Sequence, residues 1–411
     1  MTSRERMLAT LRHETPDHAP LYSWVFGFEP APQWRRREPG SPAGRWYSGR
    51  LEHIHTLPQA WDVGHDFARV DAWLELGVDD LLDVSVPWSH APEVSWRDSE
   101  SPAGKEDPQY PVMTREYHTP SGALRHSVRR TGEDAGPGWV VQPAHVPLVE
   151  DYNVPRAVHH LVAGPEDAEK IRWVYRPPDA GQRARFWQRM AQVKAFAGQR
   201  EVMVQAWGAF GMDAAVWFAG AEGAIMLCME HPEAFDTLLS AIHDTDKART
   251  LLALDAGADM VCQRGWYSST DFWSPSIFRQ HLKPRIAELA AMAHERGRLM
   301  AYVMTTGVMT LGQDLMDAGV DLLYYVDPCQ DHVDLAGARR LFGRRMAVAG
   351  GINGSITLGK GSAREIRAAV CDALSVFGRA GGFILSPVDA LFPDTPWQNV
   401  RIMIEAWKEC R

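Results

Sequence analysis

The sequence predicts a single α/β domain, a (β/α)8 barrel with an N-terminal helical extension and a β-hairpin insertion near the barrel mouth. Residues 298–328 read as strand, loop, helix and strand, which is one right-handed βαβ unit. The rest of the chain repeats that unit until about eight parallel strands are expected. A doubly wound sheet would be expected to carry a glycine-rich phosphate loop after an early strand, and none is found.

The first half of the chain combines regular elements with loops rich in proline and glycine. Thr2 or Ser3 can cap the first helix, and Pro16 ends it. We expect helices at 2–11, 61–76, 155–162, 165–173 and 181–197, and strands at 20–28 and 79–86. The loop 29–49 contains Trp34-Arg35-Arg36-Arg37, which is typical of a solvated basic surface. A mobile lid that recruits an anion is the alternative.

Residues 90–153 differ in character from the repeating units. Two strand-like runs, 112–118 and 123–131, flank Pro120-Ser121-Gly122, which is the pattern of a β-hairpin. We interpret this stretch as an insertion or cap over the mouth of one barrel domain spanning 1–411, and not as a domain of its own.

The second half of the chain is the most regular part. Its strands are short apolar runs that fit burial on both faces. We expect strands at 201–208, 258–265, 299–303, 322–326, 345–352 and 382–387. We expect helices at 212–218, 220–229, 232–255, 275–294, 334–342, 363–377 and 396–407, and one of about ten residues that ends at 317–319. In such a barrel the chemistry lies at the C-terminal ends of the strands.

Composition narrows the class of protein. The 411 residues carry 43 basic and 52 acidic side chains, a net charge of −9 that argues against nucleic acid as a partner. No apolar run is seen to approach the ~20 residues of a membrane span, and the charged N-terminus resembles neither a signal peptide nor an anchor. The 5 cysteines form no close pair, so we expect no disulfide framework and a cytoplasmic location. The 16 tryptophans suggest a pocket with aromatic walls.

Three stretches in the same order resemble the uroporphyrinogen decarboxylase superfamily. They read TSRERMLATLRHETPDHAPL, FWSPSIFRQHLKPRIAELAAMAHERG and GGFILSPVDALFPDTPWQNVRIMIEAW. The resemblance covers nearly the whole chain and implies a TIM barrel with its site in the mouth. It also implies one of two chemistries, decarboxylation or methyl transfer from a corrinoid partner to a zinc-bound thiolate.

The departures from the superfamily pattern are informative. The first strand, PLYSWVFGFEP, lacks the arginine-rich segment that follows it in the haem-pathway decarboxylases, and no arginine comes before Arg35. The methyltransferases carry His-x-Cys-Gly where this chain reads Met304-Thr305-Thr306-Gly307, and a cysteine where it has Val388 or Asp389. Thioether and hydroxyl groups do not replace imidazole and thiolate on zinc. The resemblance therefore implies a divergent member.

Polar and aromatic side chains at the predicted strand ends supply the candidate site. As acids or bases, or as proton donors, we select Asp271, Tyr302, Asp327 and Asp389. As substrate-binding residues we select Trp24, Gln205, Trp207, Gln263, Arg264, Trp266, Tyr267, Met304, Thr305, Thr306 and Asn353. Asp271 could instead cap the following helix, and Arg264 could instead form a structural salt bridge.

These residues support three hypotheses. The first is a metal-independent, decarboxylase-like lyase that acts on a small carboxylated or aromatic substrate, with no cofactor. The second is a corrinoid-linked methyltransferase or demethylase, for which a zinc site from Cys262, Asp327, Cys329 and His332 can be drawn without specific spacing. The third is a barrel that binds a ligand without catalysis. A small molecule is the expected partner, with no nucleic acid and no membrane, and a homodimer stays open.

Overall fold

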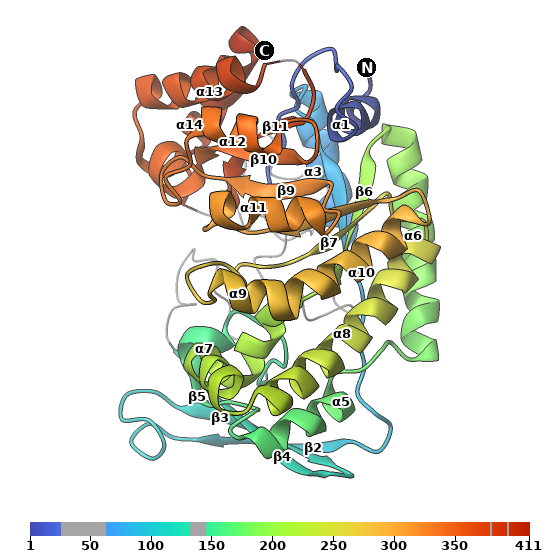
Figure 1. The fold of residues 1–411 in the computed structure, drawn as a ribbon, viewed down its shortest axis with the longest axis vertical. Helices are drawn as coiled ribbons and strands as arrows, with labels where there is room; N and C mark the ends of the chain where they lie inside the picture. Colours follow the sequence, from blue (N-terminus) through green and yellow to red (C-terminus); the bar gives the residue numbers. More distant parts are fainter. Residues whose placement is uncertain (26–62, 132–144, 379, 393) are drawn as a thin grey trace, which may run out of the picture.

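The computed structural model describes residues 1–25, 63–131, 145–378, 380–392 and 394–411 (Figure 1). The basic stretch Trp34-Arg35-Arg36-Arg37 lies outside the described residues. The main sheet is parallel, in the order β1-β6-β7-β8-β9-β10-β11. Its strands are β1 (Leu81–Ser85), β6 (Met203–Ala209), β7 (Met260–Gln263), β8 (Leu299–Val303), β9 (Leu322–Val326), β10 (Ala347–Asn353) and β11 (Phe383–Val388).

The N-terminal segment 20–25 closes this sheet into a barrel. Parallel bridges join Leu21 to Leu385 and Val25 to Leu391, beside β11. On the other side, the backbone N–H of Asp79, just before β1, donates to the carbonyl of Leu21 at 3.0 Å. The segment therefore occupies the position of the first barrel strand, and the predicted (β/α)8 architecture is confirmed.

Helices cover the outside of the barrel (Figure 1). Those between and after the barrel strands are α3 (Val63–Glu75), α6 (Ala180–Arg200), α7 (Met212–Glu230), α8 (Pro232–Asp255), α9 (Pro275–Ile277), η3 (Phe278–Leu282), α10 (Lys283–His294), α11 (Val308–Asp317), α12 (Leu335–Phe342), η4 (Gly354–Leu358), α13 (Ala363–Phe377) and α14 (Trp397–Cys410). Most follow the predicted ranges within a few residues. The main-chain pattern of η3 and η4 is that of a π-helix.

The first helix, α1 (Ser3–Leu11), closes the N-terminal end of the barrel. Thr2 caps it in a capping box with Glu5, as its sequence predicts. Met7 and Leu11 pack with the residues of the barrel interior. The carbonyl of Thr10 accepts from the N–H of Gly382 at 2.8 Å, which ties the helix to the start of β11. Only the opposite end of the barrel can therefore form the mouth.

The insertion forms a second, antiparallel sheet. Its order is β2 (Ser95–Ser101), β3 (Val112–Thr119), β4 (Gly122–Arg129) and β5 (Ala157–His159). The predicted hairpin β3–β4 is present, with Thr119 paired to Gly122 across the turn. The sheet lies at the end of the molecule opposite α13 and α14 (Figure 1).

The prediction of a helix at 155–162 is wrong. Only α4 (Asn153–Arg156) is helical there, and β5 follows it directly. In β5, Ala157 pairs with Val128 of β4 and His159 pairs with Ser127. This pairing satisfies backbone groups of β4 that would be open if β4 were the edge strand. The helix predicted at 165–173 is divided into a 3-10 turn, η2 (Pro165–Lys170), and α5 (Ile171–Val174).

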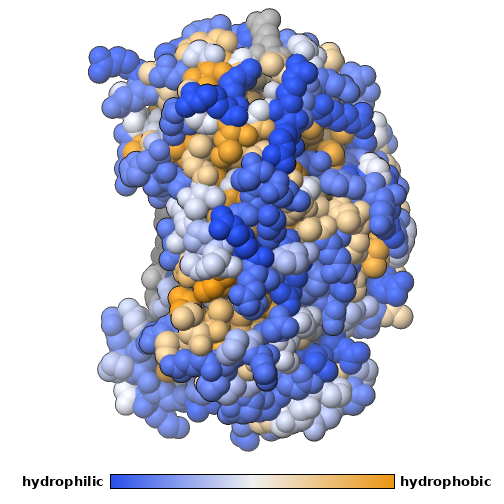
Figure 2. Space-filling model, viewed as in Figure 1, coloured by the Kyte–Doolittle hydropathy of each residue, from blue (hydrophilic) through white to orange (hydrophobic). Residues whose placement is uncertain are grey.

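The helices predicted at 212–218 and 220–229 form one element, α7, with a kink where Gly220 adopts φ +73°. Among the described residues, α7 is the helix long and apolar enough to cross a membrane by length and composition, contrary to the sequence expectation. Its 18-residue window is 67% buried inside the fold, as in the core helix of a globular protein. Met226 and Met229 of α7 are exposed. Apolar areas lie among hydrophilic ones on the face of the molecule drawn in Figure 2.

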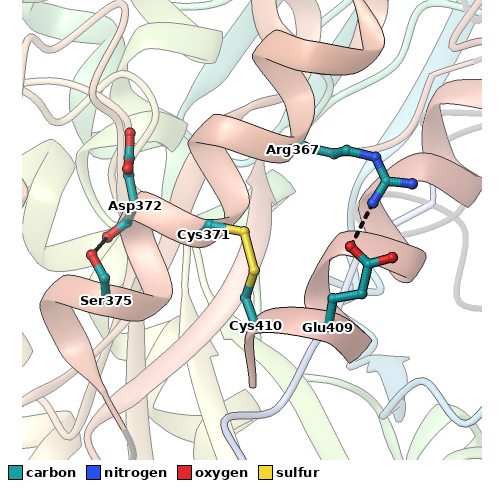
Figure 3. The surroundings of a disulfide bond; sticks show 6 residues. All are labelled: Arg367, Cys371, Asp372, Ser375, Glu409 and Cys410. Atoms are coloured by element: carbon teal, nitrogen blue, oxygen red, sulfur yellow. Dashed lines mark hydrogen bonds and ion pairs between the residues drawn. A yellow bond between two sulfur atoms is a disulfide. The ribbon is translucent and has the colours of Figure 1, made fainter.

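The structure contains a disulfide, although the sequence predicted no disulfide framework. Cys371 on α13 and Cys410 on α14 form a disulfide with a Cα–Cα distance of 5.5 Å (Figure 3). They are 39 residues apart in the sequence, and the packing of the two helices brings them together. Arg367 of α13 pairs with Glu409 of α14 at 2.8 Å in the same interface.

Candidate active site at the barrel mouth

Five aromatic rings form the floor of the mouth. The ring of Trp24 lies 4.9 Å from Trp207, 5.7 Å from Trp266, 4.8 Å from Tyr324 and 5.3 Å from Tyr325, measured between centroids. These rings come from the first strand, β6, the loop after β7, and β9. The structure therefore brings three of the predicted tryptophans together. It adds two tyrosines that the sequence placed only in a buried strand.

A buried carboxylate lies beneath this floor. Asp83 of β1 accepts hydrogen bonds from Gln205 Nε2 at 2.7 Å, Trp207 Nε1 at 3.0 Å and the Tyr22 hydroxyl at 3.1 Å. Burial raises the pKa of Asp83, and these donors oppose that change. Gln205 and Trp207 thus both point into the barrel, and both donate to a protein carboxylate. Asp83 was missed, and its only sequence signal is an acid inside an apolar strand.

Asp389, directly after β11, lies at the rim of the floor. Its Oδ1 accepts a hydrogen bond from Trp266 Nε1 at 3.1 Å, and its carbonyl accepts one from the Tyr325 hydroxyl at 2.9 Å. Its backbone adopts φ +74°, a conformation that costs a non-glycine residue about 1–3 kcal/mol and is concentrated at functional sites. Burial raises the pKa of Asp389 to about 6. Such a carboxyl group can hold or release a proton near neutral pH.

Arg264, at the end of β7, is held by two carboxylates. Its Nε donates to Asp213 at 2.8 Å and its Nη2 donates to Asp151 at 2.9 Å. The guanidinium also lies 4.5 Å from the ring of Trp266 and 4.6 Å from that of Trp217. The predicted contact with a substrate carboxylate is therefore not supported, because the salt-bridge alternative is the one observed. Asp151 and Asp213 come from distant segments, and sequence reasoning missed both.

Tyr267 lies beside this ion pair. Its backbone N–H donates to Asp213 at 3.0 Å, and its ring centroid is 5.8 Å from the Arg264 guanidinium. Burial raises the pKa of the Tyr267 hydroxyl. Tyr267 is therefore a neutral, partly exposed part of the wall next to Trp266.

A second group of polar residues follows β7, β8 and β9 around the rim, with acids after β7 and β9 and threonines after β8. Asp271 is exposed and accepts from the Thr306 hydroxyl at 2.6 Å, beside the partly exposed Thr305. Asp331 accepts from the backbone N–H groups of Gly307 and Val308 at 2.7 and 3.1 Å, at the start of α11. Burial raises the pKa of Asp331, and nearby carboxylates add to the effect. Ser274, and not Asp271, caps the helix that follows.

Asp327 and Asn353 link the ends of β9 and β10. Asn353 Nδ2 donates to Asp327 Oδ2 at 2.7 Å, while Asp327 Oδ1 accepts from the N–H of Cys329 at 2.8 Å. Asn353 Oδ1 accepts from the N–H of Ile356 at 2.6 Å and so caps η4. Asp327 has 0% exposure. Their contacts are those of a structural connection between strand ends.

Three predicted site residues lie on the wrong face of the barrel wall. Tyr302, Met304 and Gln263 are directed outward, toward the layer between barrel and helices. Ala301 and Val303 pack in the barrel interior, whereas Tyr302 and Met304 pack in the outer core cluster. A Cβ at Gly211, at the start of α7, would clash with Gln263 Nε2, so Gln263 packs against that outer helix. Side chains alternate between the two faces of a strand, which explains the outward direction.

The described side chains do not fit a metal ion. In the ranges that the structure describes, no group of three or more His, Cys, Asp or Glu residues is arranged to hold one. The ligand set drawn from Cys262, Asp327, Cys329 and His332 is therefore not assembled. Cys262 packs in the barrel interior, and Cys329 Sγ lies 3.5 Å from the Thr357 hydroxyl. At the positions that correspond to the zinc-binding motifs of the methyltransferases, this chain has Met304, Thr305, Thr306 and Val388 or Asp389. These side chains do not form a zinc site.

Comparisons with known proteins agree with this architecture. A family model described as uroporphyrinogen decarboxylase (URO-D) matches residues 149–410. Uroporphyrinogen decarboxylase of Coxiella burnetii is 26% identical over 185 residues, 43% of this chain and 48% of that protein. The enzyme of Thermus thermophilus is 30% identical over 162 residues, covering 38% and 42% of the two chains. Methylcobamide:CoM methyltransferase MtaA of Methanosarcina barkeri is 27% identical over 157 residues, covering 38% and 43%.

The aligned stretch thus spans about half the length of these relatives or less. Among solved structures, a methyltransferase from Methanosarcina mazei superimposes with a TM-score of 0.54 at 17% identity, covering 100% of this chain and 99% of that one. At this identity the likeness concerns the fold alone. Since the family model matches well over half of the residues, the chain belongs to the uroporphyrinogen decarboxylase family.

Proposed function

We propose that this chain is a lyase of the decarboxylase type, with Asp389 as the group that transfers a proton at the barrel mouth. The observation that carries the proposal is the state of Asp389. Its backbone is strained, and its carboxyl group, with a pKa raised to about 6, lies at a strand end beside the aromatic floor and the Trp266 indole. Raised carboxyl pKa values of this kind suit general acid catalysis near neutral pH.

The proposed step is the replacement of a carboxylate by a proton. The bond from the substrate carbon to its carboxylate breaks, CO2 leaves, and the electron pair stays on the carbon. Neutral Asp389 then gives its proton to that carbon and becomes a carboxylate, which the Trp266 N–H stabilises at 3.1 Å. A proton from the solvent restores Asp389, so one substrate carboxylate and one proton give one C–H bond and CO2, and atoms and charge balance without a cofactor.

The aromatic floor supports a small substrate with an aromatic or other flat face. Trp24 and Trp207 are 7% and 2% exposed, so both rings are packed within the protein, and the partly exposed Trp266 is the ring of this group that a substrate would meet first. Large rings bind flat apolar groups well. A substrate carboxylate placed over this floor would lose water, and its conversion to neutral CO2 would relieve that cost.

The exposed pair Asp271 and Thr306 is a second location for acid–base chemistry in this proposal. The Thr306 hydroxyl donates to Asp271 at 2.6 Å, which leaves the second carboxylate oxygen to face solvent or substrate. Asp327 has a smaller part here, because its two oxygens accept from Asn353 and Cys329.

Methyl transfer is the second candidate function. The likeness to methylcobamide:CoM methyltransferase, at 27% identity, favours it. The absence of fitting zinc ligands among the described side chains weighs against it, because a thiolate acceptor needs such a metal in that chemistry. We derive no step through zinc or a corrinoid.

A screen of small carboxylic acids by thermal shift, followed by CO2 release from each hit, tests the proposal. Wild type should release CO2, and D389N should bind the same acid but lose turnover by a factor of about 100 or more. D372N, at an exposed aspartate of α13 that has no part in the proposed site, is the control and should retain wild-type activity. A D389N variant with wild-type turnover would overturn the role of Asp389. About one zinc per chain together with methyl transfer, and no CO2 release, would favour the second candidate.

A further inference from the structure

A chain of four side chains connects the insertion to the proposed acid. Asp151 follows the insertion's hairpin in sequence and lies before α4. It accepts two hydrogen bonds from Arg264 Nη2, at 2.9 and 3.2 Å, and one from Trp217 Nε1 at 3.1 Å. Arg264 lies 4.5 Å from the ring of Trp266, whose Nε1 donates to Asp389.

We propose that Asp151 is a positioning residue for the proton-transfer site. It holds the guanidinium of Arg264 against the face of Trp266 and so fixes the indole that meets Asp389. The inference rests on the proposed role of Asp389, and it gives the insertion a part in the chemistry of the mouth.

The geometry leaves Arg264 little freedom. It is 1% exposed, and its other partner, Asp213, is 0% exposed and accepts at 2.8 Å from Arg264 and at 2.7 Å from the Ser268 hydroxyl. Asp213 therefore anchors one side of the guanidinium from α7, and Asp151 anchors the other from the insertion. A planar guanidinium held at both edges presents its face in a fixed direction, which suits stacking on an indole.

The charges of Asp151 and Arg264 change the pKa of Asp389 in opposite directions. The negative charge of Asp151 raises the pKa of Asp389, and the positive charge of Arg264 lowers it. Removing the charge of Asp151 removes the first influence and leaves Arg264 with one neutralising partner fewer. Both charge effects favour the ionised form of Asp389, whereas loss of the Trp266 hydrogen bond would favour its neutral form.

The test is the titration of Asp389 itself, so it needs no substrate. We would measure the rate of carbodiimide-dependent amide formation at Asp389 by peptide mass spectrometry from pH 4 to pH 8, in wild type and D151N. Loss of the charge alone should lower the midpoint in D151N, so positioning is read from a double-mutant cycle. W266F should raise the midpoint in wild type and raise it by less than half as much in D151N, whose indole is no longer held against Asp389. D151E, which keeps the charge, should restore most of the wild-type midpoint.

The matched control is D98N. Asp98 also belongs to the insertion and also holds an arginine, Arg115, through two hydrogen bonds of 2.6 Å. Asp98 does not belong to the series of contacts that leads from Asp151 to Asp389, so D98N should leave the midpoint unchanged. A change in D98N equal to that in D151N would indicate loss of structure in the insertion and would overturn the inference.

An equal rise of the midpoint when W266F is added to wild type and to folded D151N would also overturn it. If D151N does not fold, the isosteric pair D151E and D151Q, which differ in charge alone, gives the same comparison. A failure of the proposed function gives a different result from a failure of this inference. A wild-type midpoint near 4 would remove Asp389 as an acid near neutral pH, while the comparison of W266F in D151N and in wild type would still decide the role of Asp151.

Discussion

The indole Nε1 of Trp266 lies 3.1 Å from Oδ1 of Asp389, and this contact joins the loop after β7 to the end of β11 across the barrel mouth. Both residues are partly exposed, so the contact is at the rim and not in the closed interior. It connects the aromatic floor, through Trp266, with the carboxyl group best suited to proton transfer. The role of each of the two residues can be tested by a substitution of its own.

Removing the N–H of Trp266 should make Asp389 a weaker acid. In W266F the ring remains, but the donor that lowers the pKa of Asp389 is lost, so the pKa should rise above about 6. Amide formation at Asp389 as a function of pH would report this rise. W187F, at an exposed tryptophan of α6, is the control and should leave the midpoint unchanged. A midpoint that falls in W266F would contradict the assignment of the donor.

Removing the carboxyl group of Asp389 should stabilise the fold at neutral pH. Its folded pKa of about 6 is above the ordinary 3.8, so the stability linked to its neutral form is present below pH 3.8 and is lost as pH rises through 6. D389N avoids that loss and should gain up to about 3 kcal/mol at pH 8, and little at pH 4.

Urea unfolding of wild type and D389N at both pH values measures this gain. D394N, at an exposed aspartate nearby, should change stability by less than about 0.5 kcal/mol at either pH. Equal stability of D389N and wild type at pH 8 would mean that Asp389 is not desolvated.

The barrel was predictable because its signals are local. β8 and β9 begin and end at the predicted residues, since both are apolar runs bounded by charged, glycine or Asp-Pro stops. β5 was missed because it forms through a non-local interaction, the pairing with β4. The disulfide was missed for the same reason, since helix packing joins two cysteines that are 39 residues apart.

The site was predictable only in part. Trp24, Trp207 and Trp266 could be selected because strand ends are expected to meet at the mouth. Tyr302 was placed on the wrong face, because a shift of one residue in a strand reverses the direction of a side chain. Asp151 and Asp213 have no local signal, since their importance comes from Arg264, which is distant in sequence from both.

Breaking the buried ion pair of Arg264 should cost much stability. Asp213 has 0% exposure, so R264M leaves an uncompensated carboxylate in the core and should cost about 3–5 kcal/mol. Urea unfolding measures this loss, and adding D213N to R264M should recover part of it. R340A breaks an exposed pair with 73% and 68% exposed side chains and should cost less than about 1 kcal/mol. An R264M variant as stable as R340A would contradict a buried pair.

Reducing the disulfide should loosen the C-terminal helices. The bond between Cys371 and Cys410 closes a long loop, so its loss should cost about 2–4 kcal/mol. The effect extends to the barrel seam, because Trp407 Nε1 on α14 donates at 2.8 Å to the carbonyl of Ala19, just before the first strand. Dithiothreitol should lower the Tm of wild type and leave that of C371S unchanged. Alkylation of all five cysteines in unreduced, unfolded protein would show that the bond is not formed.

Acidification should destabilise the insertion sheet through His126. This side chain of β4 has 0% exposure, and neither ring nitrogen has a hydrogen-bond partner among the described residues. Burial lowers the pKa of His126 to about 3, and the nearby His159, His160 and Arg115 add to the effect. Between pH 3 and about 6.5 the unfolded chain therefore binds a proton that the folded chain does not, and stability falls as pH falls through this window.

From pH 7 to pH 5 this histidine alone should cost wild type about 2 kcal/mol. In H126F the ring volume stays but the proton site is gone, so the pH dependence between 7 and 5 should be smaller by that amount in urea unfolding. H118F, at an exposed histidine of the neighbouring strand β3, should keep the wild-type dependence. A pH dependence in H126F equal to that of wild type would mean that His126 takes up its proton inside the folded sheet, which would require a partner for its ring that the described residues do not supply.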